Sequence, residues 1–163
     1  MRAIFAIMAL FLLSGCFDSH ERHHIALNSS DGITTTYFPR TKELQTSKKQ
    51  PLILFFFTKE CKACRVELKS LNELALKFGK EAEFVGIINS KIGSIEELEE
   101  EEGEKIEFMV IADYSSVDYF SKAVGGVFGV PTLFIFDSNG KFYKKFLGLT
   151  PKEILEKELK FLI

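Results

Sequence analysis

Two cysteines three residues apart stand where an apolar run ends and a helical pattern begins, and this junction constrains the chain more than any other feature. Residues 52–57 are apolar at every position, which is typical of a strand covered on both faces. Apolar residues then recur at steps of three and four from Cys64 to Phe78, which predicts a helix with one buried face that ends at Gly79. We therefore expect Cys61 to lie exposed at the helix N-terminus and Cys64 to be buried.

This placement favours thiol chemistry. The positive end of the helix dipole and the free backbone N–H groups stabilise a thiolate, so the pKa of Cys61 should be lowered. Lys59 and Lys62 act in the same direction, and Glu60 opposes them. The spacing also brings the two sulfurs within bonding reach. We predict reversible thiol–disulfide exchange, in which Cys61 attacks a partner disulfide and Cys64 resolves the mixed disulfide.

The same spacing is also compatible with half of a zinc site, a static structural disulfide, or two unrelated core cysteines. Zinc requires four ligands, whereas the chain offers only Cys16 and three histidines close together in sequence, His20, His23 and His24. The strand-then-helix context favours a redox pair over these alternatives. We therefore expect no metal and no cofactor other than the cysteine pair itself.

The beginning of the chain has the pattern of an export signal. Arg2 supplies a positive charge, residues 4–13 are apolar without a break, and Ser14-Gly15-Cys16 follows. This resembles a bacterial lipoprotein signal, in which residues 1–15 are removed as a signal peptide and Cys16 receives lipid. The apolar run is shorter than the about 20 residues that a membrane-spanning helix needs. An uncleaved short anchor and a cleaved soluble signal are the alternatives, and either still exports the domain.

The remaining chain divides into a tether and one domain. Residues 16–31 begin with the lipidated cysteine and continue as a polar stretch without apolar period, which predicts a flexible tether with solvated histidines. Residues 32–163 have the length of one globular domain. The formal net charge of the chain is −2, so there is no basic field that would attract nucleic acid.

The predicted elements follow the order of an α/β domain with a mixed sheet. β-Branched and apolar runs predict strands at residues 32–38, 52–57, 83–89, 108–112, 130–136 and 141–146. The helix after the second strand makes a β-α-β unit with a parallel strand pair. Asn139-Gly140 between the last two strands predicts an antiparallel hairpin. The cysteines then lie at the carboxyl end of a central strand, where open α/β sheets place their sites.

Three further helices are expected. Ser94 and Glu97 form a capping-box pattern that opens a helix through the acidic run 96–104, whose glutamates we interpret as a solvated face and not as a cation site. Another helix is expected from Ser116 onward. Pro151 at the first helical position opens the last helix. Its buried face is expected to hold Ile154, Leu155, Leu159 and Leu162.

With these elements in place, two segments resemble a known family. Residues 57–67, Phe-Thr-Lys-Glu-Cys-Lys-Ala-Cys-Arg-Val-Glu, and residues 129–137, Gly-Val-Pro-Thr-Leu-Phe-Ile-Phe-Asp, are similar to the thioredoxin-fold TlpA/ResA/CcmG-like group of membrane-anchored thiol–disulfide oxidoreductases. The resemblance implies a three-layer α/β/α sandwich with a mixed central sheet and an extra helix–strand insert. It also implies a cis peptide bond at Pro131 beside the cysteines, and substrate binding by Val130, Pro131 and Thr132.

The chain departs from the family pattern in ways that affect proton transfer. Glu60 stands where the family usually has tryptophan, and the proline common between the two cysteines is absent. Phe55 replaces the buried acid that thioredoxin carries six residues before its first cysteine. Proton transfer at Cys64 would then fall to Glu60, Glu67 or water.

The resemblance implies a function in the bacterial cell envelope. The chain is expected to be anchored by lipid on Cys16, to face the periplasm, and to lie at the inner membrane in preference to the outer. It would take electrons from a membrane donor of the DsbD/CcdA kind. It would then reduce disulfides in client proteins, with apocytochrome c as the client that the family suggests.

Other functions are compatible with the same residues. The same chemistry run in reverse would make a disulfide oxidase or isomerase, and an unreducible cysteine pair would favour an adaptor. A copper chaperone of the Sco-like kind would need a late histidine ligand, and no histidine follows His24. A peroxidase would place its cysteine in a different, Pro-Thr-containing context.

Overall fold

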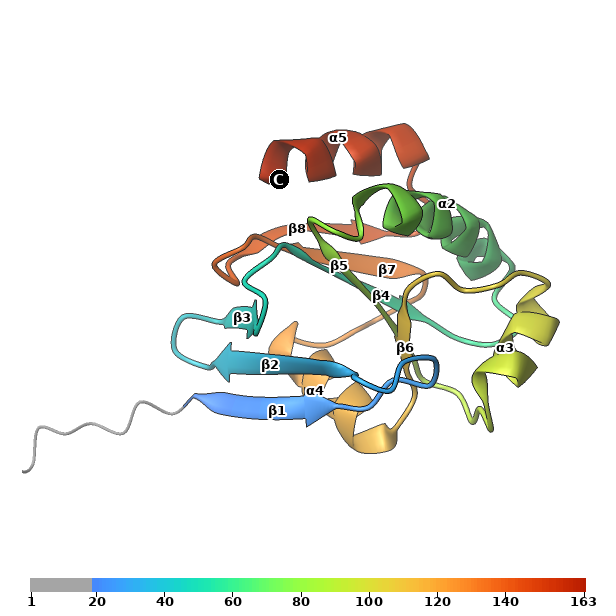
Figure 1. Cartoon of the computed structure of the whole chain (residues 1–163), viewed down its shortest axis with the longest axis horizontal. Coiled ribbons are helices and arrows are strands. Elements are labelled where there is room, and N and C mark those ends of the chain that lie inside the picture. The colour runs from blue at the N-terminus through green and yellow to red at the C-terminus, as the bar shows by residue number, and fades with distance from the viewer. Residues whose placement is uncertain (1–18) are drawn as a thin grey trace, which may run out of the picture.

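The computed structural model describes residues 19–163, so the predicted signal peptide and Cys16 lie outside the described residues. Figure 1 shows how the elements are arranged. The strands are β1 His20–His24, β2 Ile33–Phe38, β3 Glu43–Thr46, β4 Leu52–Phe57, β5 Glu83–Ile88, β6 Met109–Ile111, β7 Thr132–Phe136 and β8 Phe142–Leu147. The helices are α2 Lys62–Phe78, α3 Ile95–Glu102, α4 Tyr114–Ala123 and α5 Lys152–Leu162.

The main sheet has five strands in the order β6-β5-β4-β7-β8. Strand β4 runs parallel to β5 and antiparallel to β7, and β7 pairs antiparallel with β8. This confirms the predicted parallel pair, the hairpin and the mixed sheet. Because β4 and β7 are antiparallel with Phe56 opposite Thr132, the carboxyl end of β4 and the amino end of β7 lie at the same edge of the sheet.

Helices cover both faces of this sheet. Alternate β4 side chains point to opposite faces, so Phe55 and Phe57 join a cluster with α2 and α5, whereas Leu54 and Phe56 join a cluster with α4. Figure 1 shows α2 and α5 on one side of the sheet and α4 with the strands β1–β3 on the other. The three-layer fold class is thus confirmed, with a small second sheet added to one outer layer.

That small sheet contradicts part of the predicted tether. Residues 20–24 form β1, which pairs antiparallel with β2 from His20 opposite Tyr37 to His24 opposite Ile33. Strand β3 completes the sheet from a segment in which no strand was predicted. Apolar periodicity did not predict β1 because this strand is held by backbone hydrogen bonds to β2 and not by an apolar stripe. The folded domain therefore begins at β1, before residue 32.

His24 is the clearest correction, because it is fully buried and not solvated. Its Nδ1 lies 2.8 Å from the Ser116 hydroxyl and its Nε2 lies 3.1 Å from the Thr35 hydroxyl. Burial lowers the pKa of His24 to about 4, Arg22 acts in the same direction, and Asp113 opposes both. The ring is therefore neutral at physiological pH and links β1 to β2 and α4.

The last helix also differs in detail from its prediction. Pro151 is the N-cap residue, so α5 starts at Lys152, one residue later than expected. Leu155 and Leu159 are buried as predicted, whereas Ile154 is 43% exposed. The buried face is narrower than expected because only Leu155 and Leu159 join the core cluster, while Glu156 and Glu158 on the other faces of α5 pair with α2 and β8.

The buried neutral His24 predicts a specific pH dependence of stability. An unfolded histidine titrates near pH 6.5, so between that value and about 4 the unfolded chain binds more protons than the folded one. This shift makes the free energy of unfolding higher above pH 6.5 than at about pH 4, by on the order of 3 kcal/mol. The difference is lost progressively as the pH falls through this range. Urea unfolding of the His24→Gln variant should lack this component.

The neighbouring exposed residue supplies the control. His23→Gln should keep the wild-type change in free energy of unfolding between pH 7 and pH 4, since His23 is exposed. The same pH dependence in both variants would contradict the assignment.

Candidate active site

The two predicted cysteines form a disulfide at the start of α2, with their Cα atoms 5.1 Å apart. Cys61 is the N-cap residue of α2, and its sulfur accepts a hydrogen bond of 3.1 Å from the backbone N–H of Cys64. Cys64 is 2% exposed, whereas Cys61 is partly exposed. One sulfur can therefore meet a large partner, and the other is sheltered beneath it.

The burial of Cys64 follows from the helical pattern. Cys64, Leu68, Leu71, Ala75 and Phe78 are all buried on one face of α2, as their spacing predicts. The helix ends at Gly79, whose N–H donates to the Ala75 carbonyl oxygen. The apolar contacts along this face fix the helix against the sheet, and with it the position of both sulfurs.

The segment before β7 leaves the sheet at the same edge as the cysteine loop. Phe56 lies opposite Thr132, so Phe57, which ends β4, and Pro131, which precedes β7, both lie at the carboxyl end of β4. The Val130–Pro131 peptide bond is cis. The Thr132 hydroxyl donates to the Gly129 carbonyl at 2.6 Å. Val130 and Cys61 both pack against the core cluster that contains Cys64.

The strand beneath the cysteines carries aromatic rings and no acid. Phe55 is 1% exposed, and its ring stacks on that of Phe57 with a centroid distance of 4.8 Å. Phe108 meets Phe55 edge-on at 6.5 Å. Strand β4 therefore supplies no carboxylate that could exchange a proton with Cys64.

A buried acid comes instead from the helix itself. Glu67 lies one turn beyond Cys64 on α2 and is 1% exposed. Its Oε2 accepts a hydrogen bond of 3.0 Å from the Thr150 N–H, and within residues 19–163 its Oε1 has no hydrogen-bond partner. Burial raises the pKa of Glu67, and the bond from Thr150 opposes that effect only in part. A carboxyl group with a raised pKa and a free oxygen can hold or release a proton.

Glu60, the other candidate for proton transfer, lies in a different setting. It is exposed and its backbone takes a left-handed conformation with φ of 61°. Its side chain makes no hydrogen bond or ion pair with any of the residues that the structure describes. The structure thus separates the two glutamates: Glu67 is buried one helical turn from the sheltered cysteine, and Glu60 faces solvent.

Acidic helix α3 contacts the residues that flank the cysteines, which sequence reasoning missed. The Lys59 Nζ lies 2.7 Å from Glu97 Oε1 and 3.0 Å from Glu101 Oε2. Arg65 Nε lies 3.2 Å from Glu102 Oε2. The predicted solvated face holds for Glu97, which is 48% exposed, whereas Glu101 is partly buried and Glu102 is buried. Their spacing was the available signal, because Glu97 and Glu101 are four residues apart and share a helix face.

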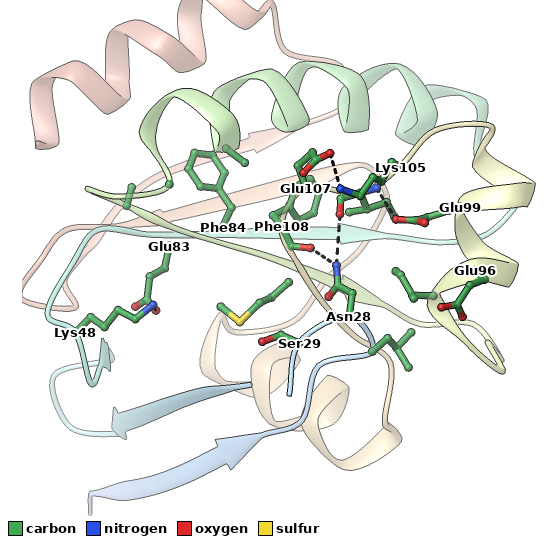
Figure 2. Close-up of a pocket in the computed structure, with 17 residues that line it drawn as sticks. Asn28, Ser29, Lys48, Glu83, Phe84, Glu96, Glu99, Lys105, Glu107 and Phe108 are labelled. Atoms are coloured by element: carbon green, nitrogen blue, oxygen red, sulfur yellow. Dashed lines mark hydrogen bonds and ion pairs between the residues drawn. The ribbon is translucent and has the colours of Figure 1, made fainter. Parts of the chain in front are cut away.

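Two hollows lie near the sheet edges. One, of about 820 Å³, is lined by Ser90, Ile92, Glu97, Tyr114 and neighbouring residues, and Ser90 accepts a hydrogen bond from the Lys59 N–H. The other, of about 640 Å³, lies beside β6 and is lined among others by Asn28, Glu83 and Phe108, as Figure 2 shows. Neither cysteine lines either hollow, but the first adjoins the cysteine loop because Ser90 and Glu97 both contact Lys59.

The part of the chain that the structure describes, residues 19–163, offers no site for a metal. It contains no group of three or more histidine, cysteine, aspartate or glutamate side chains placed to hold such an ion. The same residues form no helix long and apolar enough to cross a membrane.

Comparison with known proteins places this geometry in a family. The family model described as AhpC/TSA family matches residues 27–145. The thiol-disulfide oxidoreductase ResA of Bacillus thuringiensis (strain Al Hakam) is 26% identical over 170 residues, which cover 98% of this chain and 95% of that protein.

Solved structures share the fold. A putative thiol:disulfide interchange protein DsbE from Chlorobium tepidum superposes with a TM-score of 0.63 at 22% identity, covering 88% of this chain and 93% of that one. The exposed lipoprotein thioredoxin of Streptococcus pneumoniae superposes with a TM-score of 0.62 at 20% identity, covering 88% and 100%. The family match spans most of the chain, and the cysteine pair stands at the helix start. The chain thus belongs to the AhpC/TSA family and is a thioredoxin-fold thiol–disulfide oxidoreductase whose redox group is the Cys61–Cys64 pair.

Proposed function

We propose that the chain is a lipid-anchored, periplasm-facing reductant of disulfides in client proteins. The observation that carries this proposal is the asymmetry of the cysteine pair: Cys61 is partly exposed at the N-terminus of α2 and Cys64 is buried behind it. A nucleophile that must reach a protein-sized partner needs the first position, and a resolving thiol needs the second. The name of the Bacillus relative, a thiol-disulfide oxidoreductase, supports the same chemistry.

The reaction starts from the reduced pair. The Cys61 thiolate attacks one sulfur of a client disulfide, so a Cys61–client bond forms, the client S–S bond breaks, and one client thiolate leaves and takes up a proton. The helix N-terminus stabilises the attacking thiolate. The mixed disulfide then stands at the exposed end of α2, where the sheltered Cys64 can reach the Cys61 sulfur within the same turn.

Resolution requires that Cys64 lose a proton. Its thiolate attacks the Cys61 sulfur, the Cys61–client bond breaks, and the second client thiolate leaves and takes up a proton. The client has then gained two electrons and two protons, and the chain holds the disulfide seen in the structure. Glu67 is the proton acceptor that the geometry favours, since it is buried one helical turn away, its Oε1 has no hydrogen-bond partner among residues 19–163, and its burial raises its pKa.

The client is proposed to bind along the edge where the two loops meet. The backbone of Val130 can pair with an extended client segment, while Pro131 and Thr132 are buried and would act by fixing the backbone of this segment. Exposed apolar side chains flank this segment, with Phe128 90% exposed and Leu147 66% exposed. Such a surface suits a partly unfolded polypeptide, which agrees with apocytochrome c as the client class.

The location and the electron donor complete the proposal. Cys16 would carry the lipid that anchors the domain, with residues 1–15 removed. A pneumococcal relative in fold is named a lipoprotein, which supports this arrangement. A membrane donor of the DsbD/CcdA kind would return the pair to its reduced form, and such donors favour the inner membrane. The alternative direction of electron flow would make the chain a disulfide oxidase or isomerase.

Trapping tests the assigned roles of the two cysteines. A full chain with Cys64→Ser should accumulate mixed disulfides with a disulfide-containing model protein through Cys61, because nothing resolves them. Cys61→Ser should accumulate none, since Cys64 is buried. Non-reducing electrophoresis with mass spectrometry of the linked peptides provides the measurement, and equal trapping by both variants would refute the assignment.

The role of Glu67 predicts a kinetic defect without loss of stability. Glu67→Gln should slow release of the client from the Cys61 mixed disulfide by about 10²-fold, the contribution expected of a positioned proton acceptor. The release rate should rise with pH in the wild type as Glu67 loses its proton, above the usual range for glutamate because its pKa is raised. Stopped-flow measurement across pH should show that this rise is absent from the variant.

A second buried glutamate provides the control for that experiment. Glu83 is 5% exposed and has an unpartnered Oε2 within the described residues, but it lies at the amino end of β5, the opposite edge of the sheet. Glu83→Gln should leave the release rate and its pH profile unchanged. An equal effect of both substitutions would indicate a general loss of buried charge and not proton transfer.

The reduction potential decides the direction of electron flow. Equilibration of the full chain in glutathione or dithiothreitol buffers gives the potential of the Cys61–Cys64 pair. We expect a value near or below about −270 mV, as in thioredoxin, which would suit a reductant fed from a membrane donor. A value near about −120 mV, as in DsbA, would instead assign the formation of disulfides to this chain.

A further inference from the structure

Helix α3 touches the chain on both sides of the cysteine pair. Lys59 stands two residues before Cys61 and binds Glu97 and Glu101, while Arg65 stands one residue after Cys64 and binds Glu102. Figure 1 shows α3 beside the end of the sheet at which α2 begins. The helix is therefore placed to act on the cysteines through their charged neighbours.

The contacts on Lys59 are unusually complete for a lysine near the surface. Its side chain is 25% exposed, its Nζ bridges two carboxylates of α3, and its backbone N–H donates to Ser90 Oγ at 3.2 Å. The hydrogen bonds to Glu97 and Glu101 raise the pKa of Lys59, and Lys59 lowers the pKa of Glu97. The Lys59 ammonium therefore stays charged, and the carboxylates of Glu97 and Glu101 neutralise its charge.

The glutamates on the other face of α3 make different contacts and do not bind Lys59. Glu99 accepts a hydrogen bond of 2.8 Å from the Ile106 N–H, and Figure 2 shows Glu96 and Glu99 on the side of the hollow beside β6. Glu97 and Glu101 are four residues apart and both reach Lys59. Leu98 is fully buried between these faces and anchors the helix to the core cluster that contains Cys64.

We propose that Glu97 and Glu101 are positioning residues for the thiol chemistry, which act through Lys59 by compensating its positive charge two residues before Cys61. A free Lys59 would stabilise the Cys61 thiolate, and pairing with the two glutamates reduces this stabilisation. Helix α3 thereby moderates the reactivity of Cys61 and keeps the reduced pair less stable, so the pair is a stronger reductant. The inference rests on the proposed role of Cys61 as the attacking thiol.

The direction in which the reactivity of Cys61 changes distinguishes charge compensation from a role of α3 in holding the loop in place. If α3 only held the loop in place, loss of the ion pairs from either side would slow Cys61 in the same way. Charge compensation requires opposite changes: freeing Lys59 must speed Cys61, and removing Lys59 must slow it by leaving two carboxylates uncompensated. A unit charge at about 8 Å in a water-like dielectric changes thiolate stability by about two- to threefold.

The test is the alkylation rate of Cys61 in the reduced full chain. Iodoacetamide labelling at pH 6, followed for the Cys61 peptide by mass spectrometry, reports the thiolate fraction. Glu97→Gln with Glu101→Gln should raise the rate about threefold, and Lys59→Met should lower it about threefold. Combining all three substitutions removes two negative charges and one positive charge, so the rate should lie between those of the two variants.

A matched pair on the same helix provides the control. Glu96→Gln with Glu100→Gln removes the same charge from positions that make no ion pair with Lys59. This control should change the alkylation rate of Cys61 clearly less than Glu97→Gln with Glu101→Gln does. In glutathione buffers, the threefold change expected for the paired variant corresponds to a potential about 14 mV more oxidising, at 29.6 mV per tenfold.

Two results would overturn the proposal: an equal effect of the control pair, or slower alkylation after both Glu97→Gln with Glu101→Gln and Lys59→Met. Alkylation of Cys61 requires no client and no electron donor, so its result stands whichever direction the pair works in. If the trapping experiment fails but the alkylation rates change as expected, the proposed function is refuted and the charge compensation stands.

Discussion

Burial of β4 on both faces is the constraint on which the rest of the molecule depends. A strand with no exposed side must be flanked by β5 and β7 and covered by helices on each face, and the alternating clusters around it meet that requirement. Its carboxyl end is then the place where a helix must begin and an antiparallel neighbour must start. The cysteine loop and the segment at Pro131 meet at one edge for this reason.

The same packing explains where the acid of the site lies. Phe55 and Phe57 stack within the core beneath α2, and a carboxylate at either position would be buried among aromatic rings without a partner. Glu67 avoids that cost because the Thr150 N–H, at the turn before α5, donates to one of its oxygens. The acid that we propose for proton transfer therefore comes from the helix and not from the strand, and it depends on a contact with the turn before α5.

The sequence was sufficient for features that arise from local periodicity. The buried face of α2, the parallel pair and the hairpin follow from apolar spacing and turn residues, and the structure has all three. The cis bond at Pro131 came from the resemblance alone, since only about 5–6% of X–Pro bonds are cis. Strand β1 with His24, and the pairing of Lys59 with Glu101, are contacts between distant segments, and no local pattern encodes them.

These distant contacts change how the reactivity of the pair is explained. Adding up the charges near Cys61 in the sequence counts Lys59 and Lys62 as two cations that favour its thiolate. In the folded chain Lys59 is engaged by α3, and Lys62 is exposed, where water and salt screen its charge. The backbone at the start of α2 is then the main stabiliser of the thiolate. That contribution is fixed by the strand-to-helix junction, whereas the side chains around it can adjust the potential without altering the fold.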